Sequence, residues 1–181
     1  MRRMNRWNVV VAGCGLVAIA LLAKAAVAVA HANLELGFDT FVGSLVAAGI
    51  SIVLLKMQAA PTLGIAAGDG ELTVRFDGWD RLWTLRRSVT VPTASVRSVS
   101  VSRVDGRQVR TALHKKHRGT ALPGLIRACS ESTTQGVELW DVRAAAEDVL
   151  CIDLDDAAPF RRIVLQVADP EAARVSLLRT R

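Results

Sequence analysis

Residues 125–142 have the sequence LIRACSESTTQGVELWDV, in which two largely apolar runs flank the turn-rich segment STTQG. Short runs of this kind on either side of turn residues predict two strands joined as a hairpin. Trp140 lies within the second run and is expected in the core. The hairpin is the clearest local signal for a β-rich fold.

Alternation of apolar and polar residues with a period of two recurs on both sides of this hairpin. It predicts five more strands, at residues 72–76, 89–91, 98–102, 150–154 and 163–167. About seven short strands separated by turns predict an all-β small barrel or sandwich.

A single helix is predicted after the last strand. Asp169 is expected at the N-cap, Pro170 at the first helical position and Glu171 in the first turn. Apolar residues then recur three or four positions apart, so this C-terminal helix would cover one open end of the barrel.

This order of strands and one helix resembles a pleckstrin-homology-like (PH-like) domain, of the bacterial type found in membrane-anchored actinobacterial proteins. The resemblance covers most of residues 70–175. It rests on the series GELTVRF (70–76), VPTASVRSVSV (91–101), GTALPGLI (119–126), GVELWDV (136–142), VLCIDLDD (149–156) and IVLQVADPEA (163–172). None of these segments is a catalytic signature, and the resemblance implies a PH-like fold with binding as its role.

The first 60 residues contain two apolar stretches that account for the high apolar content of 51%. They predict two transmembrane helices, at about residues 8–30 and 41–57, within a membrane anchor that spans residues 1–58. Lys24 lies toward the outer end of the first helix, where its side chain can reach the headgroups. Small residues at four-residue spacing, Gly43, Ala47 and Ser51, favour close packing of the two helices as a hairpin.

The basic residues predict the orientation of this hairpin. Arg2, Arg3 and Arg6 precede the first helix, Lys56 follows the second, and the connecting residues 31–40 contain no Lys or Arg. A multi-pass protein of the cell membrane is therefore expected, with both termini and the PH-like domain in the cytoplasm. A cleaved signal over residues 1–30 is an open alternative, which leaves the predicted side of the domain unchanged.

Proline, glycine and small residues predict a linker over residues 59–69, followed by the domain at 70–181. Three cysteines without a C-x-x-C pair argue against a disulfide scaffold or a zinc site.

Basic residues are concentrated between residues 97 and 118. This segment contains seven basic residues and one acidic residue, Asp105. The segment 103–118 has no clear strand period and is predicted to be a long loop, where binding residues are common. We expect it to contact acidic lipid headgroups or an acidic protein partner, or else to be a solvated charge run. The candidate binding residues are Arg103, Arg107, Arg110, Lys115, Lys116 and Arg118.

Other patterns are weaker. No aromatic residue interleaves this basic segment, which argues against nucleic-acid binding. The acidic group at Asp153, Asp155 and Asp156 is better explained by an exposed turn than by a metal site. Trp79 and Trp83, four positions apart, predict either a core pair or a pair at the membrane surface, and the core is the favoured interpretation.

The sequence contains no signature of a known catalytic motif such as G-x-S-x-G or a P-loop. The expected function is a membrane-tethered, non-enzymatic adaptor or scaffold module that needs no cofactor or metal. The alternatives are an acidic-lipid-binding module that uses the basic loop 103–118, and a metal-dependent enzyme at the acidic cluster. The oligomeric state is left open.

Overall fold

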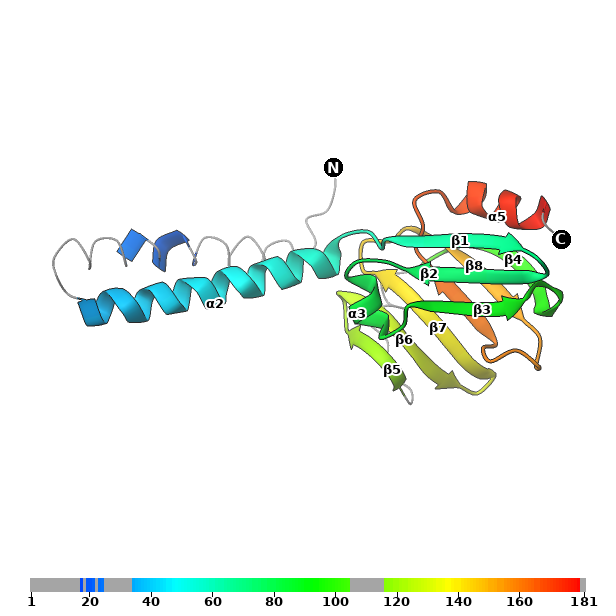
Figure 1. The fold of residues 1–181 in the computed structure, drawn as a ribbon, viewed down its shortest axis with the longest axis horizontal. Coiled ribbons are helices and arrows are strands. Elements are labelled where there is room, and N and C mark those ends of the chain that lie inside the picture. The colour runs from blue at the N-terminus through cyan, green and yellow to red at the C-terminus, as the bar shows by residue number, and fades with distance from the viewer. Residues whose placement is uncertain (1–16, 18, 22, 25–33, 105–115, 180–181) are drawn as a thin grey trace. The chain divides into compact units, whose positions relative to one another are not determined.

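The structure, a computed structural model, describes residues 17, 19–21, 23–24, 34–104 and 116–179. The chain divides into two compact units, Met1–Met57 and Gln58–Arg181 (Figure 1). Each unit is described by itself.

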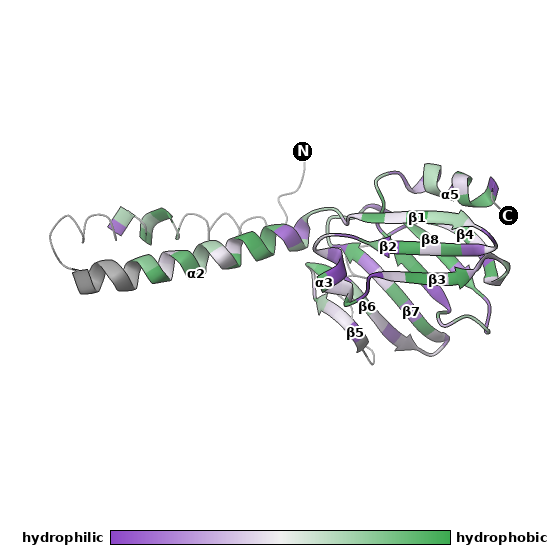
Figure 2. Ribbon diagram, viewed as in Figure 1, coloured by the Kyte–Doolittle hydropathy of each residue, from purple (hydrophilic) through white to green (hydrophobic). Residues whose placement is uncertain are grey.

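Helix α2, Leu34–Gln58, dominates the N-terminal unit and is apolar over most of its length (Figure 2). Within the described ranges, its segment Phe41–Gln58 is the one stretch of helix long and apolar enough to cross a membrane. The predicted first helix, about 8–30, lies outside the described residues except for 17, 19–21 and 23–24, which are helical. The predicted two-helix hairpin is thus described only in part.

The second unit consists of two β-sheets and two helices. Its elements are β1 (Leu63–Gly68), β2 (Glu71–Phe76), α3 (Asp80–Thr84), β3 (Ser88–Pro92), the 3-10 turn η1 (Thr93–Ser95), β4 (Val96–Arg103), β5 (Lys116–Leu122), β6 (Ile126–Thr133), β7 (Gly136–Arg143), β8 (Asp148–Leu154), β9 (Arg162–Leu165) and α5 (Pro170–Arg179). The first sheet has the order β1-β2-β3 and the second the order β4-β8-β9-β7-β6-β5.

The predicted fold class is confirmed at the level of β-sheets followed by one C-terminal helix. The strand number is wrong, because residues 34–104 and 116–179 contain nine strands rather than seven. Strand β1 lies within the predicted linker, since LGIAAG pairs along its length with β2 despite its small side chains. Strand β5 occupies the end of the predicted basic loop and pairs with β6.

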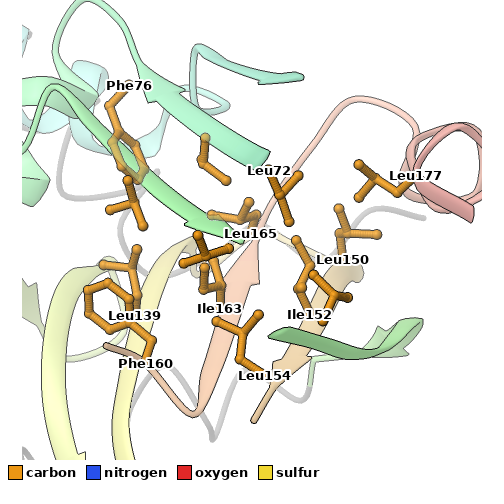
Figure 3. Close-up of a cluster of buried hydrophobic side chains, with 14 residues drawn as sticks. Leu72, Phe76, Leu139, Leu150, Ile152, Leu154, Phe160, Ile163, Leu165 and Leu177 are labelled. Atoms are coloured by element: carbon orange, nitrogen blue, oxygen red, sulfur yellow. The ribbon is translucent and has the colours of Figure 1, made fainter. Parts of the chain in front are cut away.

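The main core lies between the two sheets. Leu72 and Phe76 of the three-stranded sheet face Leu139, Ile152 and other apolar side chains of the six-stranded sheet (Figure 3). These strands have one buried face because their apolar residues alternate with polar ones. Helix α5 contributes Leu177 to this core, which agrees with the predicted covering role of the C-terminal helix.

The opposite face of the six-stranded sheet carries a second apolar cluster around Trp140, Val142 and Val164. Trp140 is therefore buried as predicted, although on this face rather than between the sheets. Cys129 and Cys151 are buried on strands β6 and β8 and form no disulfide with each other, since other strands separate β6 from β8 in the sheet order.

Helix α3 is held in place by a buried charge cluster. The guanidinium of Arg143 on β7 donates to the carboxylates of both Asp80 on α3 and Asp141, the latter at 2.6 Å. The same guanidinium donates to the carbonyl oxygen of Ala59 at 3.2 Å, and Asp80 accepts from the amide of Thr62 at 2.5 Å. The cluster thus joins the first residues of the domain, α3 and the six-stranded sheet at one end of the domain (Figure 1).

Burial raises the pKa of both carboxylates in this cluster. For Asp141, burial together with the negative charge of Asp80 outweighs Arg143 and raises the pKa to about 7. The pKa of Asp80 is also raised, although the Thr62 amide and Arg143 oppose the effect of burial. One oxygen of Asp141 is buried with no hydrogen-bond partner among the described residues.

The free energy of unfolding should fall as pH rises from about 4 to about 7. Between the unfolded and folded pKa values of Asp141 the folded state binds more protons, so raising the pH removes stability, by at most about 1.4 kcal/mol per pH unit for one group. Urea unfolding of the full chain in detergent at several pH values measures this slope. Asp141→Asn should show a shallower slope, because the titrating carboxyl group is absent. Equal slopes would contradict the assignment.

Candidate anion-binding surface

The segment 79–88, WDRLWTLRRS, forms a compact corner between β2 and β3. Helix α3 lasts only five residues because Leu85 adopts a left-handed conformation (φ 55°) and ends it. The Thr84 hydroxyl donates to the Asp80 carbonyl at 2.7 Å, which closes the last turn. The chain then reverses, and Arg86 and Arg87 lead into β3.

Three large apolar side chains of this corner face solvent. The exposed fractions are 40% for Trp79, 57% for Leu82 and 51% for Leu85. Leu122 on β5, a strand in contact with α3, is also exposed. The described part of the domain has six exposed large apolar side chains, and four of them therefore lie on α3, the turn after it and β5. Val175 and Leu178 on α5 are the other two.

Trp79 and Trp83 stack on each other, with ring centroids 5.5 Å apart and planes inclined by 21°. The favoured core interpretation is wrong for Trp79, which is exposed, and holds only in part for the half-buried Trp83. The spacing of the two tryptophans could not decide between core and surface. Residues four positions apart lie on the same face of a helix, whether that face is buried or exposed.

Four arginines surround the same corner. Arg81, Arg86, Arg87 and Arg118 line an open pocket of about 640 Å³ together with Leu82 and Leu85. Within residues 34–104 and 116–179, none of the four forms a salt bridge with a carboxylate. Unpaired guanidinium groups gathered at one place make a surface suited to anions, since each presents donors in the fork geometry that carboxylates and phosphates fit.

Arg86 occupies the least exposed position of the four. Its guanidinium carbon lies 5.2 Å from the ring centroid of Phe160. Burial, and then the positive charge of Arg118, lowers the pKa of Arg86. The Nε of Arg86 and the indole nitrogen of Trp83 are buried donors without an acceptor in the described part of the chain. A bound anion would relieve the repulsion between Arg86 and Arg118.

The predicted binding residues divide between two edges of the six-stranded sheet. Arg103 ends β4, opposite Asp148, while Lys116 and Arg118 lie on β5. Because β4 and β5 are the two edge strands, they stand five strand spacings apart, about 24 Å. Arg107, Arg110 and Lys115 lie outside the described residues. Of the predicted set, the structure brings Arg118 to the pocket beside α3.

A second polar pocket, of about 300 Å³, lies near β4, β8 and β9 and also contains arginines. Here each guanidinium has an acidic partner. Arg97 and Arg161 both bind Asp156, and Arg162 binds Asp153 at 2.6 Å. Burial raises the pKa of Asp153, but hydrogen bonds from Arg162 and Ser98 outweigh it and lower that pKa overall.

The predicted acidic turn is found at this second pocket. Asp155 accepts hydrogen bonds from the amides of Ala157 and Ala158 at 3.1 Å, as in a turn. Asp153 and Asp156 are engaged by the arginines named above. No group of three metal-ligating side chains occurs among the described residues.

Three of the four pocket arginines, Arg81, Arg86 and Arg87, are not among the residues that the sequence analysis singles out. The signal was present in WDRLWTLRRS, where three arginines, two tryptophans and two leucines occur within ten residues without a second acid after Asp80. Comparison with known proteins adds no relative, because no family model, no curated protein and no solved structure matches the chain.

Proposed function

We propose that this protein is a membrane-anchored, non-enzymatic binding module that recognises anionic groups through a surface beside α3. This α3 surface comprises Trp79, Leu82 and Leu85 with the four pocket arginines, Arg81, Arg86, Arg87 and Arg118. The observation that carries the proposal is the pocket of Arg81, Arg86, Arg87 and Arg118, to which the described residues bring no carboxylate. The contrast with the second pocket, where Asp153 and Asp156 engage the arginines, distinguishes a candidate binding surface from an ordinary charged face.

The proposed anchor is helix α2. Its large side chains, including Phe41, Leu45 and Ile52, are exposed, whereas Ser44 and Ser51 are buried. Each serine donates to a backbone carbonyl of its own helix, so neither hydroxyl is left unpaired in an apolar surrounding. An apolar outer surface over a small, polar inner face is the reverse of a helix exposed to water, and it suits lipid.

The predicted hairpin remains part of the proposal. A Cβ at Gly43 would lie 3.8 Å from a methyl carbon of Leu21, and this proximity supports the proposal that α2 packs against a preceding helix at Gly43. The charge pattern then favours both termini and the domain in the cytoplasm of a cell-membrane protein. A role as an adaptor or scaffold follows if the anionic group belongs to another macromolecule.

We also propose that the domain is PH-like. This proposal rests on its small size, its β-sheets and its C-terminal helix. Two features differ from the seven-strand expectation: nine strands within the described ranges, and a parallel pairing of β7 with β9. The binding proposal depends on the α3 surface and not on this resemblance. The enzyme alternative is weaker, because the carboxylates of the acidic turn are already engaged.

Titration of the full chain with inositol hexakisphosphate tests the proposal. The chain is placed in nanodiscs of zwitterionic phosphatidylcholine, so that the soluble polyphosphate is the one strong polyanion present. The double variant Arg86→Gln/Arg118→Gln should bind at least tenfold more weakly. The matched control, Arg97→Gln/Arg161→Gln, removes the same charge from the paired arginines and should change the affinity less than twofold. An equal loss of affinity in both variants would show that binding depends only on the net charge of the protein, and it would overturn the proposal.

A further inference from the structure

We propose that the α3 surface is a second membrane contact, which docks on anionic phospholipids of the leaflet from which α2 emerges. The surface comprises Trp79, Leu82 and Leu85 with the four pocket arginines, Arg81, Arg86, Arg87 and Arg118. The inference rests on the proposed function, since it names the source of the anionic group.

Covalent connection places this surface near the membrane if α2 spans it. Helix α2 ends at Gln58, and the next residue, Ala59, already accepts a hydrogen bond from Arg143 within the domain. Thr62 is bound to Asp80 of α3 itself. Four residues extend at most about 14 Å, so the end of the domain that carries α3 lies within that distance of the end of the spanning helix.

The composition of the surface suits the boundary between water and lipid. Trp79, Leu82 and Leu85 expose apolar area, and tryptophan is enriched at the level of the headgroups. The neighbouring arginines provide paired donors for headgroup phosphates. Elsewhere on the described part of the domain, the large exposed apolar side chains are Leu122 on the neighbouring strand β5, and Val175 and Leu178 on α5, where Arg174 is paired with Glu171.

Leu85 gives an independent indication. Its left-handed backbone is unfavourable for a side chain with a Cβ, and about half of the residue is exposed to water. Backbone strain of this kind is found preferentially at functional positions. Insertion of Leu85 among lipid chains would supply the burial that the domain itself does not give.

A lipid surface is favoured over an acidic protein because of the tether. A short connection keeps the headgroups at a high effective concentration next to the arginines, whereas a soluble protein has to compete with them. An acidic protein would also have to cover three exposed apolar side chains that the lipid interface accommodates directly.

A depth measurement on the full chain tests the inference. A nitroxide is attached at Leu82→Cys in a Cys14→Ala background, because Cys129 and Cys151 are buried and resist labelling. In nanodiscs with about a third phosphatidylglycerol, the label should lie below the phosphate level, with oxygen accessibility raised over that of a polar relaxant. The control label, at Val175→Cys on α5, should remain in water.

The arginines provide the second arm. Arg86→Gln/Arg118→Gln, or pure phosphatidylcholine, should return the Leu82 label to water. A label that stays in water in anionic nanodiscs, while inositol hexakisphosphate still binds, overturns the lipid inference and leaves the proposed function intact. If poly-glutamate binds while the Leu82 label stays in water in anionic nanodiscs, the partner is an acidic protein and the lipid inference is wrong. Loss of both signals refutes both proposals.

Discussion

Replacement of Arg143 by leucine is expected to lower the free energy of unfolding by about 3–5 kcal/mol. The substitution leaves the carboxylates of Asp80 and Asp141 buried without their cation, and it also removes the donor to Ala59. Single domains have only about 5–15 kcal/mol of stability, so this variant should populate unfolded or partly folded states. Urea unfolding of the full chain in detergent, followed by tryptophan fluorescence, measures the change.

The matched control is Arg174→Leu on α5. This variant breaks a salt bridge with Glu171 that is largely exposed, and surface pairs contribute about 0–1 kcal/mol. If Arg143→Leu does not fold, the triple variant Asp80→Asn/Asp141→Asn/Arg143→Leu tests the cluster instead. It removes the unpaired charges and should therefore recover much of the stability. A loss below 1 kcal/mol for Arg143→Leu alone would contradict the buried cluster.

The second large effect is expected for Gly119→Ala on β5. Gly119 has φ +109°, a conformation that L residues rarely adopt, and a Cβ there would collide with the carbonyl oxygen of Ala128 and lie 2.7 Å from Cys129 Cα. Backbone strain and overpacking each cost about 1–3 kcal/mol, so a combined loss of about 3 kcal/mol is expected. A thermal melt of the full chain in detergent should show the loss as a lowered midpoint.

Gly119→Ala should also weaken polyanion binding, because a displaced β5 moves Arg118 away from Arg86. The control is Gly68→Ala on β1, where no atom lies within 4 Å of the added carbon. Removal of glycine from a strand at an open position is neutral or slightly stabilising. A Gly119→Ala midpoint equal to that of Gly68→Ala would show that β5 accommodates the side chain.

The strands with a clear period of two could be predicted from the sequence. In β2 and β8, apolar residues at every second position face the core. Strand β1 was not predicted, because LGIAAG consists largely of residues that are common in linkers. Its extended structure depends on its pairing with β2. Strand β5 escaped prediction because an edge strand with Lys116, His117 and Arg118 has little apolar content to alternate.

The candidate surface was predictable only in part. Arg118 belongs to a basic run that composition reveals, but its neighbours Arg86 and Arg87 lie thirty residues away in the sequence. The two meet because α3 packs against β5, a long-range contact without a local sequence signal. The partners of Arg143 were equally hidden, since nothing local distinguishes a buried arginine at a strand end from an exposed one.

The position of β9 in the six-stranded sheet has a consequence for biosynthesis. Strand β9 contributes only residues 162–165, yet it separates β8 from β7 and pairs with both. Until these residues have been translated, the sheet exists only as the separate sets β4-β8 and β7-β6-β5. Because domains generally fold as units during synthesis, the nascent chain has to keep both sets apart from other apolar surfaces until the residues from Arg162 onward emerge. A stop codon before Arg162 should therefore yield a chain without a folded domain, a natural substrate for quality-control proteolysis.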